Sequence, residues 1–343
     1  MNNKNMPNYR MLSSKEKKEF IIECLKSDLD KTSWLYNQAI KIRENECKKY
    51  VYIRAIIDVS NYCVCSCKFC GNSIQIKNMK KYCLNKNNII NAVKEAKKLG
   101  IDMIHLASGE NPNFNYNMLI EVVREIISMG LNCEIAFGVL PFSVLEKLKQ
   151  VGLERIILKF ETSNNQLYNI YKTCHRTLND TIQYIQKLQK MGFKVGSGNI
   201  VGFFDQSNLD LANDLLLLEQ LDVSMASTSC LQPNKEQPKE LQEVGDANLT
   251  LKFLSLMRLV MFDKKLCIPT NSTLGKDGKI EALKLGANEI SINFTPKEYT
   301  GNYSIYTGAN RHKANYEETI NIIKSAGMEL TTYKNMKEKG LVW

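Results

Sequence analysis

The chain has 343 residues, of which 44% are hydrophobic and 24% charged, so it has enough apolar material for one large barrel or two domains. No stretch approaches the roughly 18 consecutive apolar residues of a membrane span, and the polar start lacks the apolar region of a signal peptide. The formal net charge of +10 arises from lysines scattered over helix-like stretches, which is typical of solvated helix surfaces. We therefore expect a cytoplasmic protein without a membrane or nucleic-acid partner.

The N-terminal residues 1–50 are expected to form a helical extension, in which Ser13 or Ser14 caps a segment rich in Lys and Glu. Over residues 51–300, short apolar runs alternate with longer helical patterns, and this alternation predicts a parallel sheet. The strands are expected at 54–59, 103–107, 132–137, 155–160, 194–201, 224–229, 266–270 and 289–293. Helices are expected between them at 89–99, 118–129, 144–151, 181–191, 209–221 and 249–260.

Eight strand–helix units of this kind fit an α/β fold of the complete (β/α)8 TIM-barrel type. Four helices are followed by a glycine just before the next strand, and glycine takes the left-handed C-cap conformation at little cost. These glycines are Gly100, Gly130, Gly152 and Gly192. Residues 301–343 are expected to form a C-terminal closing segment with a helix at 317–327.

The chain contains eleven cysteines, and they are unevenly distributed. Because the cytosol keeps thiols reduced, we expect metal binding, catalysis or burial rather than disulfides. Four of them fall within one short window directly after the first expected strand: Cys63, Cys65, Cys67 and Cys70. In a barrel, the loop after a strand lies on the face that carries active sites.

Cys63, Cys67 and Cys70 have the spacing C-x3-C-x2-C. A cubane 4Fe-4S cluster has four irons and each thiolate satisfies one, so three thiolates leave one iron open for another ligand. An aromatic residue, Phe69, directly precedes the last cysteine. The pattern therefore predicts an iron–sulfur centre with one free coordination position.

This loop, placed after a first barrel strand, resembles the cysteine loop of the radical S-adenosylmethionine (SAM) superfamily. The resemblance implies that Cys63, Cys67 and Cys70 hold a 4Fe-4S cluster whose open iron binds SAM, with Phe69 against the adenine. It also implies SAM contacts from later strand ends and loops, namely Ser108, Gly109, Glu110, Glu161, Arg176, Ser197, Asn199 and Val201. Arg176 is interpreted as a substitute for an arginine that family members place near Thr181.

Zinc is the alternative occupant, because four thiolates can hold a tetrahedral zinc ion. Zinc sites usually join two separated pairs of cysteines, whereas this window opens a large fold with no second pair. Cys65 is therefore interpreted as a bystander thiol inside the motif.

The pattern from about residue 15 to 335 is similar to the branch that contains biotin synthase, the FeFe-hydrogenase maturase HydE and the methylornithine synthase PylB, and is most like HydE. In biotin synthase, three further cysteines and an arginine hold an auxiliary cluster. The corresponding positions here are His105, Cys133 and Gly196, so the resemblance disfavours that cluster. An auxiliary metal site at His105 and Cys133 is a minor alternative to a core histidine.

Polar residues at other strand ends are expected to form the substrate pocket: Glu134, Lys159, Thr270, Asn271, Thr273, Tyr303 and Tyr306. Lys159 is also a candidate catalytic residue. A cation inside a barrel is costly unless paired, so Glu134 or an anionic substrate is expected to face it.

The resemblance implies an anaerobic enzyme that cleaves SAM reductively to a 5'-deoxyadenosyl radical. This radical would abstract hydrogen from, or attack, a small amino-acid-like or thioether substrate. An external one-electron reductant such as ferredoxin or flavodoxin would then be a partner. Two alternatives are sulfur insertion of the biotin or lipoyl type from another sulfur source, and a zinc-stabilised binding protein.

Overall fold

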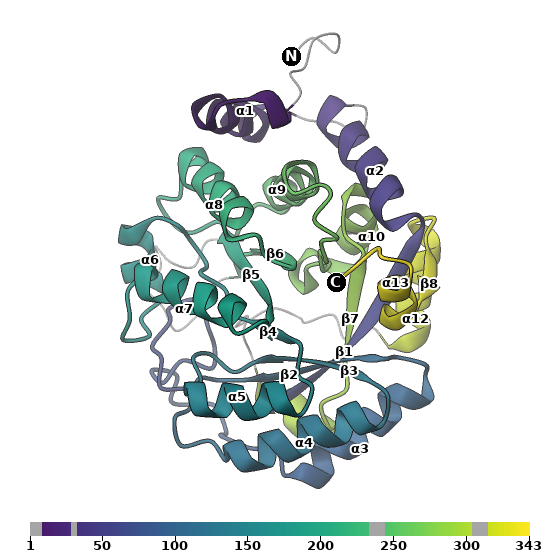
Figure 1. Cartoon of the computed structure of the whole chain (residues 1–343). Coiled ribbons are helices and arrows are strands. Elements are labelled where there is room, and N and C mark those ends of the chain that lie inside the picture. The colour runs from purple at the N-terminus through teal and green to yellow at the C-terminus, as the bar shows by residue number, and fades with distance from the viewer. Residues whose placement is uncertain (1–8, 29–32, 233–243, 304–314) are drawn as a thin grey trace.

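The computed structural model describes residues 9–28, 33–232, 244–303 and 315–343. Its strands form one parallel sheet, and helices surround this sheet (Figure 1). The strands are β1 (Tyr50–Ser60), β2 (Met103–Ser108), β3 (Asn132–Ala136), β4 (Arg155–Ile157), β5 (Lys194–Val201), β6 (Met225–Cys230), β7 (Glu289–Asn293) and β8 (Glu329–Thr331).

The helices alternate with the strands over most of the chain. They are α1 (Ser14–Lys26), α2 (Trp34–Cys47), α3 (Lys86–Lys98), α4 (Tyr116–Ser128), α5 (Phe142–Gln150), α6 (Asn165–Tyr171), α7 (Leu178–Lys190), α8 (Asn208–Leu221), α9 (Ala247–Val260), α10 (Gly275–Leu285), α11 (Lys297–Thr300), α12 (Tyr316–Ser325) and α13 (Tyr333–Glu338), with short 3-10 turns η1 (Tyr9–Met11) and η3 (Ser272–Leu274).

The sheet has the order β6-β5-β4-β3-β2-β1-β7, and β8 pairs with the first residues of β1. The α/β class and the parallel sheet predicted from the sequence are confirmed. The predicted strand at 266–270 lies between β6 and β7 but forms only isolated bridges, Met225 to Cys267 and Pro269 to Glu289. Pro269 has no N–H to donate toward β6, which limits the pairing on that side, whereas the Thr270 N–H still donates to the Glu289 carbonyl on the β7 side. The complete eight-strand ring is therefore not confirmed.

Helix ends follow the local chemistry of the sequence. Ser13 caps α1 with a reciprocal capping box to Glu16. The glycines expected to stop helices do have positive φ, for example +75° at Gly100 and +98° at Gly152. Most helices begin two or three residues earlier than expected, because the apolar periodicity of each helix becomes apparent only after its first residues.

The core lies between the sheet and the surrounding helices. All six residues of β2 are buried, so this strand is covered on both faces, as parallel strands usually are. The helices α1 and α2 pack on α8 and α9. No helix in the described part of the chain combines the length and apolar character needed to cross a bilayer.

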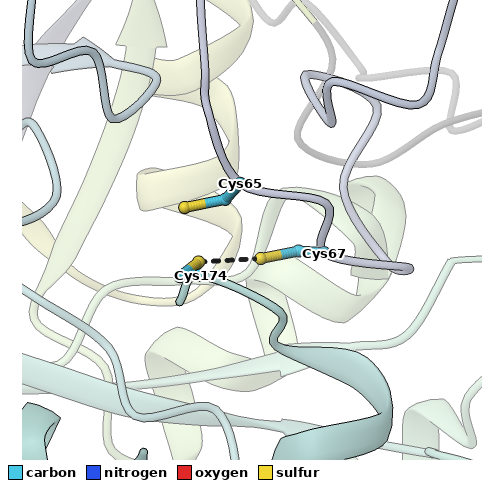
Figure 2. A group of neighbouring side chains, drawn as sticks. All are labelled: Cys65, Cys67 and Cys174. Carbon is cyan, nitrogen blue, oxygen red and sulfur yellow. Dashed lines mark hydrogen bonds between the residues drawn. The ribbon is translucent and has the colours of Figure 1, made fainter. Parts of the chain in front are cut away.

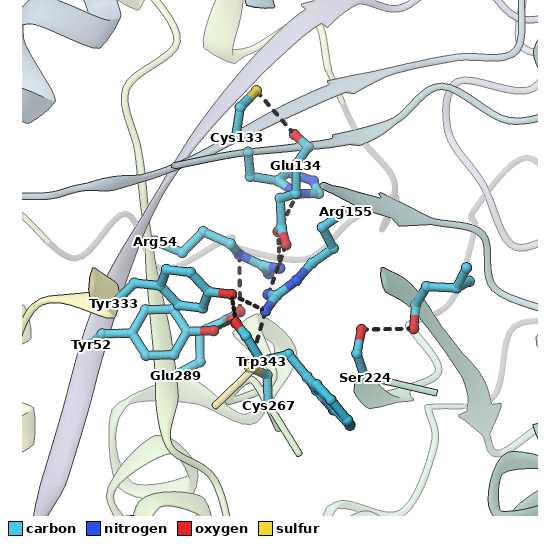
Figure 3. A network of polar contacts seen from close by, with 12 residues as sticks. Tyr52, Arg54, Cys133, Glu134, Arg155, Ser224, Cys267, Glu289, Tyr333 and Trp343 are labelled. Carbon is cyan, nitrogen blue, oxygen red and sulfur yellow. Dashed lines mark hydrogen bonds and ion pairs between the residues drawn. The ribbon is translucent and has the colours of Figure 1, made fainter. Parts of the chain in front are cut away.

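A network of buried charges fills the interior of the sheet around Glu134 (Figure 3). Its carboxylate is fully buried and accepts hydrogen bonds from Arg54 at 2.7 Å, His105 at 2.8 Å and Arg155 at 3.0 Å. Burial alone raises the pKa of Glu134, but the charges of both arginines and the hydrogen bond from His105 lower it below its ordinary value. Glu134, expected at the substrate rim, is thus a fully paired interior group.

The C-terminal segment closes this interior. Arg155 also donates to the Tyr333 hydroxyl at 3.0 Å, and Tyr333 donates to the carbonyl oxygen of Trp343. The Tyr333 ring meets Tyr52 edge-on at 5.2 Å, while the Lys194 ammonium lies 3.9 Å from the Trp343 ring centre. The last residues of the chain therefore stabilise the end of the sheet opposite the cysteine loop.

Replacing Glu134 with alanine should leave Arg54 and Arg155 without their shared counter-ion in a buried site. We expect a loss of about 3–5 kcal/mol in the free energy of unfolding, measured by anaerobic denaturant titration. Glu121→Ala, which removes an exposed partner of Lys86, is the control and should change stability by no more than about 0.5 kcal/mol. Equal stability of both variants would contradict the role assigned to Glu134.

Candidate active site

The four clustered cysteines lie on one loop, residues 61–76, which we call the cysteine loop. It leaves β1 at Ser60 and crosses the carboxyl end of β2. The N–H of Gly109 donates to the carbonyl oxygen of Ser60 at 3.0 Å. The N–H of Val64 donates to the carbonyl oxygen of Glu110 at 2.8 Å. A Cβ on Gly109 would lie 2.3 Å from the Tyr62 carbonyl oxygen and 2.7 Å from the Cys63 Cβ, so only glycine permits this approach.

A second loop, residues 172–177 between α6 and α7, is joined to the cysteine loop by backbone hydrogen bonds. Ser66 N–H donates to the Thr173 carbonyl, and Lys68 N–H donates to the Tyr171 carbonyl, both at 2.9 Å. The Ser66 hydroxyl adds a 2.8 Å bond to that of Thr173. These bonds hold the two loops side by side.

This pairing brings a fifth cysteine, Cys174, to the cysteine loop (Figure 2). The sulfur atoms of Cys65, Cys67 and Cys174 all lie within 4.8 Å of one another, and those of Cys67 and Cys174 are 3.2 Å apart. We call these three residues the thiol triad. Cys65, interpreted from the sequence as a bystander, therefore belongs to a cluster of three cysteine side chains. Sequence reasoning missed Cys174, and its place two residues before Arg176 was the available signal.

The remaining motif cysteines, Cys63 and Cys70, lie on the same loop and are partly exposed. The Cys63 sulfur accepts a hydrogen bond from the N–H of Cys65 at 3.4 Å. A hydrogen bond from the Cys65 thiol lowers the pKa of Cys63 to about 7, although burial opposes this shift. Burial raises the pKa of the Cys70 thiol to about 12. Thiols from Cys65 and Cys67, with the nearby cations Lys172 and Arg176, hold the pKa of Cys174 well below its ordinary value.

An apolar wall backs the cysteine loop. Phe69 is buried, and its ring centre is 5.9 Å from that of Phe203, which stacks on Tyr171 at 4.2 Å. Ile200 of β5 belongs to the same apolar group as Cys65 and Cys67. Phe69, predicted beside an adenine, therefore lies among aromatic side chains next to the thiols.

Glu110 and Arg176 form a bidentate ion pair, with distances of 2.6 and 2.7 Å. Both were selected from the sequence as ligands for the amino-acid part of SAM, and the structure brings them together beside the cysteine loop. Ser108, the last residue of β2, was also predicted to contact SAM. Its hydroxyl donates a hydrogen bond to the carbonyl oxygen of Gly109.

Glu161 follows β4 and has a left-handed backbone with φ of 70°, which is costly for a residue with a Cβ. Its carboxylate is 2.9 Å from the Lys159 ammonium and 3.8 Å from that of Lys172. Lys159 also donates to the Ser229 hydroxyl at 3.1 Å. Lys159 thus pairs with Glu161, whereas the sequence had suggested Glu134.

The three β5 candidates, Ser197, Asn199 and Val201, alternate with Gly198 and Ile200 along the strand. Asn199 donates its amide hydrogen bond to Asp214 of α8 at 2.9 Å, and Val201 packs in the core under the helices. The structure therefore turns these three side chains away from the cysteine loop. The neighbouring Gly198 and Ile200 face the site instead.

A cavity of about 190 Å³ lies at the carboxyl ends of the strands. Of the expected substrate residues, Lys159, Thr270 and Asn271 line it, but Glu134, Thr273 and Tyr303 do not. Tyr306 falls outside the described residues. The sequence did not single out several other lining residues, because each is a polar residue within an otherwise apolar strand. Among them are Arg54, Asp58, Thr228 and Ser291. The Thr228 hydroxyl is buried without a hydrogen-bond partner among the described residues.

His105, Cys133 and Gly196 stand where biotin synthase has the cysteines of its auxiliary cluster. In the described part of the chain they do not form a metal site. His105 faces the cavity and is bound to Glu134. Cys133 pairs in register with Ile104, so its side chain lies on the opposite face, in the outer core. A Cβ on Gly196 would meet Ile157 and Met225 at 3.0 Å. A biotin-type auxiliary cluster therefore has no ligand set here.

Comparison with known proteins agrees with this geometry. Residues 57–218 match the family model of the radical SAM superfamily. The FeFe-hydrogenase maturase subunit HydE of Thermotoga maritima is 32% identical over 311 residues, which span 88% of each chain. Biotin synthase of Thermodesulfovibrio yellowstonii is 28% identical over 85% of this chain and 89% of its own. The crystal structure of methylornithine synthase (PylB) superposes with a TM-score of 0.80 at 22% identity, covering 94% of this chain and 99% of that one.

The fold and the cysteine loop thus define an enzyme class. The chain belongs to the radical SAM superfamily, whose members use a 4Fe-4S cluster and SAM. The residues present suit both groups: soft thiols for iron converge on one loop, and an acid–arginine pair stands beside them for a ligand that carries an amino group and a carboxylate.

Gly109→Ala should push the cysteine loop off the end of β2, because the new methyl group would overlap the Tyr62 carbonyl and Cys63. Overpacking of this kind costs about 1–3 kcal/mol, and we expect lower iron and sulfide content after anaerobic reconstitution. Gly301→Ala is the control, since Gly301 has φ of −72° and open space around it. Full iron loading of Gly109→Ala would show that this contact does not shape the loop.

Proposed function

We propose that this enzyme cleaves SAM reductively and directs the resulting radical at a small polar molecule bound in the strand-end cavity. The observation that carries the proposal is a shared wall: Lys159 lines the cavity and pairs with Glu161, which in turn faces Lys172 beside the thiols. When bound, the cluster and SAM supply a 5'-deoxyadenosyl radical, which abstracts hydrogen from or attacks the substrate.

In this proposal, Cys63, Cys67 and Cys70 hold the cluster, as the motif spacing predicts. Glu110 and Arg176 receive the amino and carboxylate groups of SAM, and Glu161 holds its ribose or amino group. Ser108 and Gly109 shape the end of β2 beneath it. Because Ser197, Asn199 and Val201 face α8, their strand neighbours take over the contact expected from β5.

The protein's own part in the reaction is to orient and to exclude water. Phe69, Phe203 and Tyr171 form an apolar cover next to the thiols, which limits access of water to a reactive radical. The Lys159 ammonium is held between Glu161 and Ser229 and lines the cavity. Arg54 and His105 also reach the cavity, but Arg54 is paired with Glu134 and Glu289, and His105 is hydrogen-bonded to Glu134.

The lining of the cavity supports a substrate with both an anionic and a hydrogen-bonding group. Lys159 supplies a cation, Asp58 an acid, and Thr228 a buried hydroxyl that has no partner among the residues the structure describes. These groups suit an amino-acid-like or thioether-containing molecule. The sequence similarity to HydE, biotin synthase and 3-methylornithine synthase is consistent with a small substrate.

The proposal includes a barrel closed through residues 266–270. The N–H of Ala226 donates to the Cys267 carbonyl at 3.0 Å, and that of Thr270 donates to the Glu289 carbonyl at 2.8 Å, so this segment is bonded on both sides. It also includes a low-potential electron carrier such as ferredoxin or flavodoxin and a cytoplasmic location. All eleven cysteines are free thiols, which suits a reducing compartment.

The test is anaerobic incubation of the reconstituted protein with SAM and dithionite, followed by mass spectrometry for 5'-deoxyadenosine. We expect the product from the wild-type chain and from Cys83→Ala, which removes an exposed thiol outside the cysteine loop. Cys67→Ala should abolish it. Undiminished product from Cys67→Ala, with folding confirmed by circular dichroism, would overturn the assignment.

A further inference from the structure

The thiol triad is a different set of ligands from the cluster motif. It contains Cys65 and Cys174, which the C-x3-C-x2-C spacing does not include, and shares with the motif only Cys67. All three side chains are at most 7% exposed. Their sulfur atoms are the one group of at least three potential ligand atoms within 4.8 Å of one another in the described chain.

The spacing of the triad suits one metal ion. With zinc–sulfur bonds of about 2.3 Å in a tetrahedral arrangement, ligating sulfurs are about 3.8 Å apart. The observed separations, 3.2 Å between Cys67 and Cys174 and at most 4.8 Å for the other pairs, bracket this value. Small side-chain rotations would therefore bring the three sulfurs to a single ion.

The backbone holds the triad in place independently of any metal. Cys65 and Cys67 flank Ser66, and Cys174 follows Thr173, so the hydrogen bonds between Ser66 and Thr173 join the two sides of the triad at its centre. The Ile74 N–H adds a 2.9 Å bond to the Cys65 carbonyl.

We infer that the cluster-free chain binds one thiophilic divalent ion of the zinc class through Cys65, Cys67 and Cys174. The ion's remaining position is open to water or to Cys63, whose sulfur contacts the N–H of Cys65. Each thiol that binds as thiolate releases its proton to solvent. Because Cys67 serves both ligand sets, zinc in the triad and a 4Fe-4S cluster on the motif exclude each other. The cysteine loop is thus a site where zinc blocks cluster assembly.

The experiment uses the full-length, metal-stripped chain under argon and titrates it with Co²⁺ as a spectroscopic probe for zinc. Thiolate-to-Co²⁺ charge-transfer absorption should rise to one equivalent and disappear when Zn²⁺ is added. Cys174→Ser should weaken Co²⁺ binding by at least the roughly 10–100-fold that loss of a supporting residue costs at metal sites. Cys65→Ser should behave in the same way.

Cys70→Ser is the matched control, because it changes the same loop and removes a motif cysteine outside the triad. It should keep Co²⁺ binding and lose iron–sulfur reconstitution, whereas Cys174→Ser should do the reverse. Zinc added before iron and sulfide should block reconstitution of the wild-type chain but not of Cys174→Ser. Reconstitution by Cys174→Ser also shows that this variant folds.

Equal Co²⁺ affinity in wild type, Cys174→Ser and Cys65→Ser would overturn the inference. So would equal loss in Cys70→Ser and Cys174→Ser, since that would place the ion on the cluster motif. Neither result depends on SAM cleavage, so failure of this inference is distinguishable from failure of the proposed reaction.

Discussion

The active site depends on one steric constraint, the contact between the backbone of Gly109 and the cysteine loop at Tyr62 and Cys63. This contact fixes the loop on the end of β2 and leaves the next residue, Glu110, beside it. Glu110 binds Arg176 in a bidentate ion pair, and Arg176 lies on the loop that carries Cys174. Thiols, acid and arginine therefore meet because a single residue without a side chain lets two strand ends approach each other.

Charges inside the sheet form two layers with different consequences. In the layer away from the cysteine loop, Glu134 is shared by Arg54, Arg155 and His105, and the C-terminal Tyr333 closes that network. This network pairs its charges with one another and serves the fold, although Arg155 Nε has no hydrogen-bond partner among the described residues. In the layer toward the cysteine loop, Lys159 and Thr228 line the cavity, and the Thr228 hydroxyl has no hydrogen-bond partner in the part of the chain that the structure describes. A polar ligand in the cavity would gain most binding energy in this layer, because buried polar groups without hydrogen-bond partners are costly.

The sequence predicted the class of fold and the position of the cysteine loop well, because strand–helix alternation and motif spacing are local signals. The sequence did not predict features that depend on which strands pair and which distant segments come into contact. The segment 266–270 has the composition of a strand, yet Pro269 limits its ladder, while β8 is short and exposed and had no signal. On β5, Asn199 is bound to Asp214 of α8 and Val201 packs in the core, a phase that the sequence does not give because both faces of this strand are buried. Cys174 is distant in sequence from the motif it joins.

We propose that Cys63, Cys67 and Cys70 hold a 4Fe-4S cluster with one iron open for SAM. The most direct measurement is Mössbauer spectroscopy of the chain reconstituted anaerobically with ⁵⁷Fe, recorded before and after SAM is added. We expect four irons per chain, of which one changes its isomer shift when SAM binds while three do not. A spectrum without cluster iron, or a cluster whose irons all remain unchanged by SAM, would contradict it.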